Sequence, residues 1–305
     1  MNVAVQAIRR TPESSADVNG LHICWDSFGN PADAPMILIM GMGSQMIGWD
    51  DEFCLQLAGK GFYVIRFDNR DVGRSSRLHH LGVPDVRRAM TRAWLGLPVD
   101  APYKLQDMTG DLFGLMDALN IQKAHIVGAS MGGGIAQYAA IYRPDRVLSM
   151  TSIMSTTGDP DLPRPDSSAV AAVGRPAPST LEDYVDYYVS NWKKLRVDRF
   201  PEEVERDRKR AIHNFERGLS PEGGGRHLMA ILASGSRRNA LRNVTVPTLV
   251  IHGDIDPLVP LAAGVDTAKC ILEAQLLVLE GMGHSMPERL WPTMIKAIAG
   301  LASRV

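Results

Sequence analysis

The chain of 305 residues is long enough for one large or two small domains, and a hydrophobic content of 45% is sufficient for a sizeable core. Its formal net charge of −1 at pH 7 excludes a nucleic acid or an anionic membrane as the main partner, because a basic excess would be needed for either. The three cysteines, Cys24, Cys54 and Cys270, are widely spaced, so neither a disulfide framework nor a zinc ribbon is expected.

The first ten residues place Arg9 and Arg10 after a short apolar patch. A secretory signal peptide has its charges first, and no apolar run in the chain approaches the length of a membrane span. We therefore expect a cytoplasmic protein without a membrane span.

Short segments rich in branched residues alternate with helical patterns along most of the chain. A helix is expected at 50–60, and an apolar stripe over 105–119 predicts another that packs on a sheet. Such alternation is typical of an α/β fold with a mostly parallel central sheet flanked by helices. The expected strands are residues 36–40, 62–67, 125–127, 147–153, 246–252 and 276–279.

The strand rhythm stops between residues 157 and 243. A proline-rich run gives way to a helix whose apolar face extends from Leu181 to Leu195, and further helices are expected at 201–217 and about 226–233, after a turn at 220–225. The aromatic residues on the first of these helices are expected to anchor the segment rather than to touch a ligand. We expect a helical cap, residues 157–243, inserted after the sixth strand of a core formed by residues 1–156 and 244–305.

The segment around Ser130 has the pattern of a nucleophile elbow, Gly-x-Ser-x-Gly. An apolar strand precedes it and a helical pattern follows it. In that device the serine occupies a sharp, strained turn, and glycines two positions before and after it allow close backbone approach. Gly128 and Gly132 fill those positions, so Ser130 is the candidate nucleophile.

A compatible acid and base follow in the chain. The strand 246–252 runs through Gly253 into two carboxylates, Asp254 and Asp256, and a glycine-rich loop after the last strand offers His284. The order Ser130, Asp256, His284 is that of α/β-hydrolases and differs from the orders of chymotrypsin and subtilisin.

From about Leu21 onward the chain resembles capped α/β-hydrolases, and among them the anthracycline methylesterases of the aclacinomycin type. In this family the acid stands at the third position after the strand-ending glycine, which implies Asp256 rather than Asp254. The resemblance implies a serine carboxylesterase that hydrolyses a small or methyl ester of a bulky acyl group and needs no cofactor. It is carried by residues 41–49, 64–75, 128–132, 246–260 and 281–287.

The resemblance also implies an oxyanion hole made by the backbone N–H groups of Met42 and Met131. Many relatives have His-Gly where this chain has Met40-Gly41, which puts the local hydrogen bonding of the loop in question rather than the backbone donors. A dinucleotide-binding fingerprint would require glycine at position 46, where Met46 stands.

Other groups near the expected site have structural interpretations. In the family the Asp68-x-Arg70 block ties a loop to the floor of the site by charge-assisted hydrogen bonds. His79 and His80 lack the i, i+4 spacing of a helical metal site, so no metal role is expected. Several methionines on the site loops could form an adaptable apolar wall or fill the core; these are Met42, Met46, Met131, Met282 and Met286.

One fold hosts many functions, so other activities are kept in view. C–C bond hydrolases, lyases and cofactor-free perhydrolases use the same three side chains, and a receptor-like binding module can retain them without turnover. Persistent ligand binding without turnover would favour the receptor. The expected partner in every case is a small molecule, an ester for the esterase, and not a nucleic acid.

Overall fold

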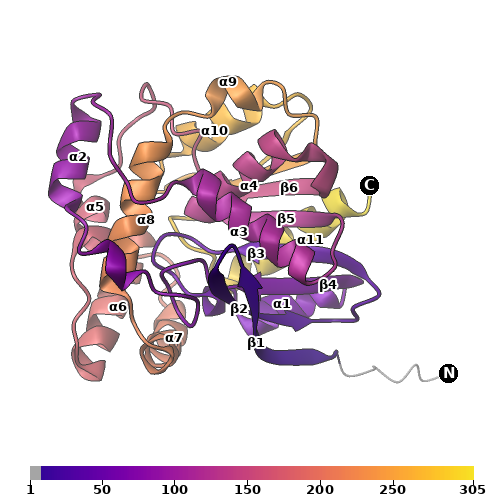
Figure 1. Ribbon diagram of the computed structural model, residues 1–305, viewed down its shortest axis with the longest axis horizontal. Coiled ribbons are helices and arrows are strands. Elements are labelled where there is room, and N and C mark those ends of the chain that lie inside the picture. The colour runs from indigo at the N-terminus through magenta and orange to yellow at the C-terminus, as the bar shows by residue number, and fades with distance from the viewer. Residues whose placement is uncertain (1–7) are drawn as a thin grey trace.

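A single eight-stranded sheet runs through the computed structural model, which describes residues 8–305 (Figure 1). Residues 1–7, which contain the apolar patch before Arg9 and Arg10, lie outside the described residues. The strand order is β1-β2-β4-β3-β5-β6-β7-β8. The strands are β1 Arg10–Val18, β2 Leu21–Phe28, β3 Ala34–Ile39, β4 Phe62–Phe67, β5 Ala124–Ala129, β6 Val147–Ile153, β7 Thr248–Gly253 and β8 Gln275–Leu279.

The mostly parallel sheet is confirmed. Pairings from β4 to β8 are all parallel, whereas β2 pairs antiparallel with both β1 and β4. The hairpin of β1 and β2 is missing from the expected strands because the edge strand β1 is polar and only partly buried. The sequence does carry a signal for this hairpin, the dipeptide Asn19-Gly20, which is typical of a type I′ turn. In the structure both residues have the positive φ that this turn requires, 52° and 78°.

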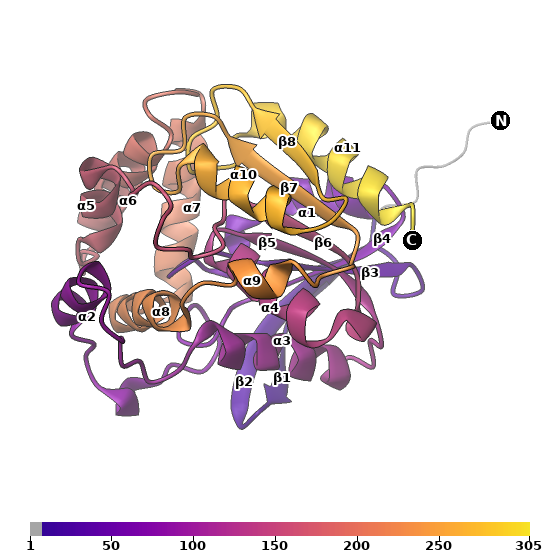
Figure 2. The ribbon, with the colours of Figure 1, turned by 90° about the horizontal axis from the view of Figure 1, so that it is seen from above.

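Helices cover both faces of the sheet (Figure 2). The helices α1 (Asp51–Ala58) and α11 (Trp291–Ala302) share one apolar cluster with the strands. On the other face α3 (Leu105–Ala118), α4 (Met131–Tyr142) and the end of α10 (Leu261–Cys270) contribute to a second cluster. Because the parallel strands are buried from both sides, they read as continuous apolar runs rather than alternating ones.

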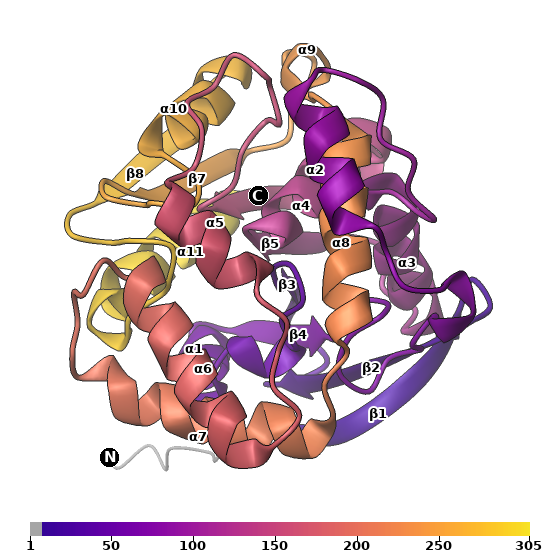
Figure 3. The same ribbon diagram turned by 90° about the vertical axis from the view of Figure 1, so that its left-hand side faces the viewer.

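The strand rhythm stops after β6 because five helices lie between β6 and β7. Figure 3 looks onto these inserted helices with the sheet behind them. The helix α2 (Val86–Trp94), which follows β4, packs beside the inserted helix α8 (Pro221–Ser234). Within the described part of the chain, no helix is both long and apolar enough to cross a membrane. The inserted helices are α5 Ser167–Gly174, α6 Leu181–Leu195, α7 Glu203–Arg217, α8 Pro221–Ser234 and α9 Arg238–Leu241.

The expected turn at 220–225 is wrong, because α8 already begins at Pro221. Proline is favoured in the first helical turn, while the glycines after it lower helix propensity. Packing explains the glycines: a β-carbon at Gly223 would lie 2.1 Å from the carbonyl oxygen of Asp71, and one at Gly225 would lie 2.6 Å from Cγ of Pro84. Close approach of α8 to the core therefore outweighs propensity.

This packing predicts that Gly223→Ala destabilises the fold. The backbone oxygen of Asp71 cannot rotate away, so α8 must shift, at an expected cost of about 1–3 kcal/mol in the free energy of unfolding. Gly300→Ala in α11 is the matched control, because a β-carbon there meets no heavy atom within 4 Å. The control should be neutral or stabilising by up to about 1 kcal/mol. Urea unfolding followed by circular dichroism compares them, and equal stability of the two variants would contradict the packing argument.

Candidate active site

The elbow forms where β5 ends and α4 begins. Ser130 has φ 54° and ψ −118°, a conformation that is costly for a residue with a β-carbon. A β-carbon at Gly128 would lie 2.1 Å from the carbonyl oxygen of Gly132, and one at Gly132 would lie 2.2 Å from that of Ile39. Only glycine fits at these two positions, so the strained turn is built by close contact among β5, α4 and the end of β3.

The structure brings the three expected side chains into one hydrogen-bonded chain. Nε2 of His284 lies 3.0 Å from Oγ of Ser130, and Nδ1 lies 2.8 Å from Oδ2 of Asp256. The other oxygen of Asp256 accepts the backbone N–H groups of Leu258 and Val259 at 2.9 and 2.8 Å. Because a carboxylate only accepts, Nδ1 of His284 carries a proton toward Asp256 and Nε2 is free to accept the hydroxyl proton of Ser130.

The two carboxylates after β7 have different surroundings. Asp254 is exposed, and its Oδ1 accepts the N–H of Gly281 at 2.7 Å. Asp256 is 5% exposed and also lies 3.8 Å from Nε2 of His252. Burial lowers the pKa of His252, and its Nε2–H donates to the carbonyl of Val259 at 2.8 Å. His252 is therefore a neutral neighbour of the acid, one that sequence reasoning took only as a strand residue.

A tight turn over residues 41–44 lies against the elbow. A β-carbon at Gly41 would lie 3.2 Å from that of Ser130, and the N–H of Ser44 donates to the carbonyl of Gly41 at 3.2 Å. Gly43 has φ 64°, a conformation that favours glycine. Met42 belongs to this turn and Met131 is the first residue of α4, so both expected oxyanion N–H groups lie in backbone beside the serine.

Asp68 and Arg70 make the structural contacts expected of them. Both oxygens of Asp68 accept backbone N–H groups, from Met46 at 2.7 Å and Arg74 at 2.9 Å, and its carboxylate also pairs with Arg217 of α7. Burial raises the pKa of Asp68 to about 6, and the backbone donors oppose that rise. Arg70 forms two hydrogen bonds to Asp111 of α3, at 2.6 and 2.7 Å.

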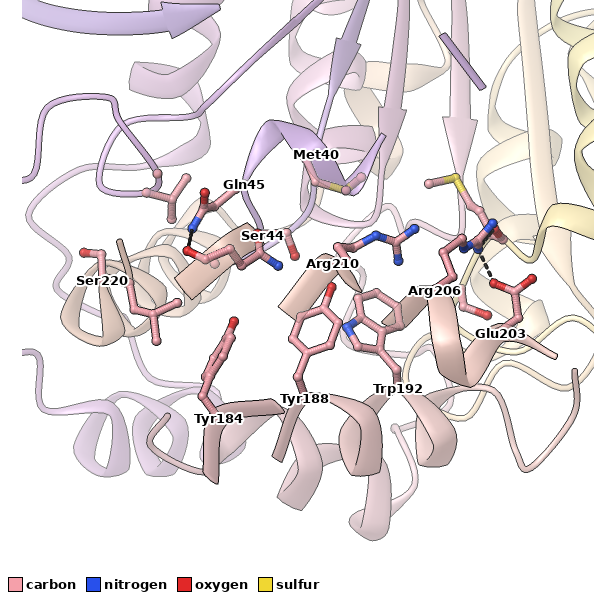
Figure 4. Close-up of a pocket in the computed structure, with 18 of the residues that line it drawn as sticks. Met40, Ser44, Gln45, Tyr184, Tyr188, Trp192, Glu203, Arg206, Arg210 and Ser220 are labelled. Atoms are coloured by element: carbon pink, nitrogen blue, oxygen red, sulfur yellow. Dashed lines mark hydrogen bonds and ion pairs between the residues drawn. The ribbon is translucent and has the colours of Figure 1, made fainter. Parts of the chain in front are cut away.

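A pocket lies between the inserted helices and the loops of the core (Figure 4). It is lined by Ser285, the residue after His284, and by Met40, but not by Ser130 or His284. Three aromatic side chains of α6, Tyr184, Tyr188 and Trp192, point into it, and Arg206 and Arg210 of α7 line it too. The expectation that the aromatic stripe only anchors the cap is therefore incomplete: Tyr184 packs against Phe215 of α7 with ring centroids 5.8 Å apart and also lines the pocket.

The methionines divide between the two roles left open by the sequence. Met46 and Met282 are fully buried in the core, whereas Met286 lines the pocket. Met40 and Met154 also line it, although sequence reasoning did not single them out for this role. The sequence could have indicated this role, because each of the two methionines directly follows a parallel strand. Ligand sites of α/β folds lie at the carboxyl ends of such strands.

His79 and His80 lie in a short exposed turn, and no cluster of three or more potential metal-ligating side chains occurs within residues 8–305.

The fold and the elbow define a class: the chain belongs to the α/β-hydrolase fold family, whose pattern matches residues 34–288, and it is a hydrolase. It is similar to a rhodomycin D methylesterase of Streptomyces peucetius, with 29% identity over 288 residues that cover 86% of this chain and 88% of the relative. It is also 26% identical to a 2-hydroxymuconate semialdehyde hydrolase of Pseudomonas sp. strain CF600, over 99% and 95% of the two chains.

Solved structures support the fold. A meta-cleavage product hydrolase from Pseudomonas fluorescens IP01 superposes with a TM-score of 0.74 at 22% identity, covering 95% of this chain and 97% of the other. The enol-lactonase from Burkholderia xenovorans LB400 gives a TM-score of 0.70 at 22% identity, covering 95% and 100%.

Proposed function

We propose that the protein is a serine carboxylesterase that hydrolyses a small or methyl ester of a bulky acyl group through an acyl-enzyme. One observation carries the proposal: Ser130 stands on the elbow within hydrogen-bond distance of His284, which is in turn held by the buried Asp256. The methylesterase relatives support the ester as substrate, because they match 86% of this chain.

The chemistry follows from the order of the hydrogen bonds. Oγ of Ser130 attacks the ester carbonyl while Nε2 of His284 takes the hydroxyl proton and then delivers it to the leaving alcohol. Water activated by His284 releases the acid in the second step. Asp256 orients the imidazole and stabilises its charged form, and the N–H groups of Met42 and Met131 stabilise the negative oxygen of both tetrahedral intermediates. All of these groups belong to the chain, so the reaction as written uses no cofactor or metal.

The inserted residues 157–243 act in this proposal as the cap of a core formed by residues 1–156 and 244–305. Support comes from the pocket, whose walls include α6 and α7 on one side and the loops after β3 and β6 on the other. The cavity of about 100 Å³ is smaller than the roughly 300–1,000 Å³ of typical ligand pockets, so a bulky acyl group requires the cap side chains to move. A cytoplasmic location is part of the same proposal.

One alternative also has support. A relative named as a semialdehyde hydrolase aligns over 99% of this chain, so C–C bond hydrolysis with the same three side chains is the second candidate. Turnover of a panel of p-nitrophenyl and methyl esters separates the two candidates. A protein that leaves every ester intact but cleaves a vinylogous diketone would be a C–C hydrolase, and one that binds ligands without turnover would be a receptor.

The first test is Ser130→Ala. The variant should lose all ester turnover and keep the fold, because it lacks only the nucleophilic oxygen. A fluorophosphonate should add once to the wild type, at Ser130, as read by intact-mass and peptide mass spectrometry. Labelling that persists in the alanine variant, or that maps to another serine, would show that the nucleophile is elsewhere.

The second test compares the two carboxylates after β7. Asp256→Asn leaves the shape but misorients the imidazole, and a loss on the order of ten-thousand-fold in kcat is expected from the equivalent change in serine proteases. Asp254→Asn is the matched control: its remaining oxygen can still accept the N–H of Gly281, so the loss should stay below about tenfold, roughly 1.4 kcal/mol of barrier. Steady-state kinetics on folded variants decide, and the reverse ranking would assign the acid to Asp254.

The third test concerns substrate size. Because side chains of α6 and α7 wall the pocket, short or methyl esters of bulky acids should be hydrolysed faster than long-chain triglycerides. Rates with a methyl ester of an aromatic acid and with emulsified triglyceride give the comparison. Preference for long chains together with activation at the oil–water interface would indicate a lipase.

A further inference from the structure

A histidine of the inserted helix α8 is hydrogen-bonded to the turn beside the elbow. Nδ1 of His227 lies 3.1 Å from the backbone nitrogen of Gly43, and its Nε2 lies 2.7 Å from the carbonyl oxygen of Arg70. A backbone N–H only donates and a carbonyl only accepts, so the ring must carry its single proton on Nε2. Burial lowers the pKa of His227 to about 4, which keeps the imidazole neutral at pH 7.

The ring is held from several directions. Arg226, the residue before it, donates to both oxygens of Asp71 at 2.7 and 2.8 Å, and the hydroxyl of Tyr103 donates to the same carboxylate at 2.7 Å. Tyr103 also lies edge-on to the imidazole, with ring centroids 6.3 Å apart. Gly223 at the start of α8 allows the helix to approach the core, because a β-carbon there would lie 2.1 Å from the carbonyl oxygen of Asp71. The next residue, Gly224, lies in contact with Gly43 of the turn.

The turn that His227 holds is the one that carries Met42. The turn has only four residues, it contacts Ser130 through Gly41, and the ring accepts the N–H directly after Met42. Movement of this backbone by about 1 Å away from the elbow would misplace the donor, and misplacements of that size cost on the order of a hundredfold in rate.

We propose that His227 is a positioning residue that holds the oxyanion turn against Ser130 from the cap side. This role rests on the proposed ester hydrolysis. The imidazole reaches the turn from α8, a helix that follows it by more than 170 residues in the chain. Only Nδ1 of His227 contacts the turn, because Nε2 is hydrogen-bonded to the backbone carbonyl of Arg70.

Two isosteric substitutions separate the two contacts of the ring. His227→Asn places an oxygen near the position of Nδ1 and can still accept the N–H of Gly43, whereas His227→Gln reaches the position of Nε2 and keeps only the contact to Arg70. Tyr103→Phe is the control for general loosening of α8, since it removes a hydrogen bond to Asp71 but none to the turn. For each variant kcat, KM, the rate of inactivation by a fluorophosphonate and Tm are measured.

His227→Gln should lower kcat and the inactivation rate by roughly ten- to a hundredfold, with KM within about twofold, because the oxyanion donor acts in the transition state. His227→Asn should stay within about threefold of wild type, and Tyr103→Phe should change Tm more than kcat. Equal rates for the Asn and Gln variants, or a rate loss that follows Tm across all three, would overturn the positioning role. Failure of the wild type to hydrolyse esters and to be labelled at Ser130 would instead overturn the proposed function.

Discussion

The close approach of three backbone segments at the elbow is the constraint on which the site depends. Gly128 and Gly132 let β5, α4 and the end of β3 come within distances that no β-carbon would permit. Those contacts hold Ser130 in its strained positive-φ conformation, so the packing of these three segments offsets the strain of one residue. Asp256 and His284 lie in the loops after β7 and β8. These two strands are neighbours in the sheet, and this brings the two side chains within hydrogen-bond distance.

Two of the inserted helices, α6 and α8, contact the backbone of the candidate site. The carbonyl of Leu195, at the end of α6, accepts the N–H of His284 at 2.8 Å, and a β-carbon at Gly283 would lie 2.3 Å from the same oxygen. The imidazole of His227 in α8 accepts the N–H of Gly43 at 3.1 Å. The loop that carries His284 and the turn over residues 41–44 are therefore both hydrogen-bonded to inserted helices. In this chain the insertion is part of the framework of the site as well as a wall of its pocket.

Much of the core was predictable because its signals are local. β4 and β6 have the expected bounds, and the order of Ser130, Asp256 and His284 follows from short motifs attached to strand ends. The start of α8 was not predictable, because its glycines are chosen for a tertiary contact with Asp71 that propensity does not encode. The same holds for His227, which lies in a helix without any motif and acts on a turn 184 residues away in the chain.

The ion pairs on the pocket wall formed by α6 and α7 could not be predicted from the sequence either. Arg196, Arg206 and Arg210 line the pocket, and each has a carboxylate partner: Asp207, Glu203 and Asp50. The alternating charges of residues 202–210 are typical of a solvated helix face. In α7, however, Glu203 and Asp207 are buried and paired with arginines. Unpaired buried charge would be strongly unfavourable, so each arginine on this wall needs its acid. Because each arginine is paired with one carboxylate, the wall is polar but carries no net charge. Such a wall suits the neutral ester of the proposed reaction. It suits the free acid less well, and that acid is the product that the second step releases.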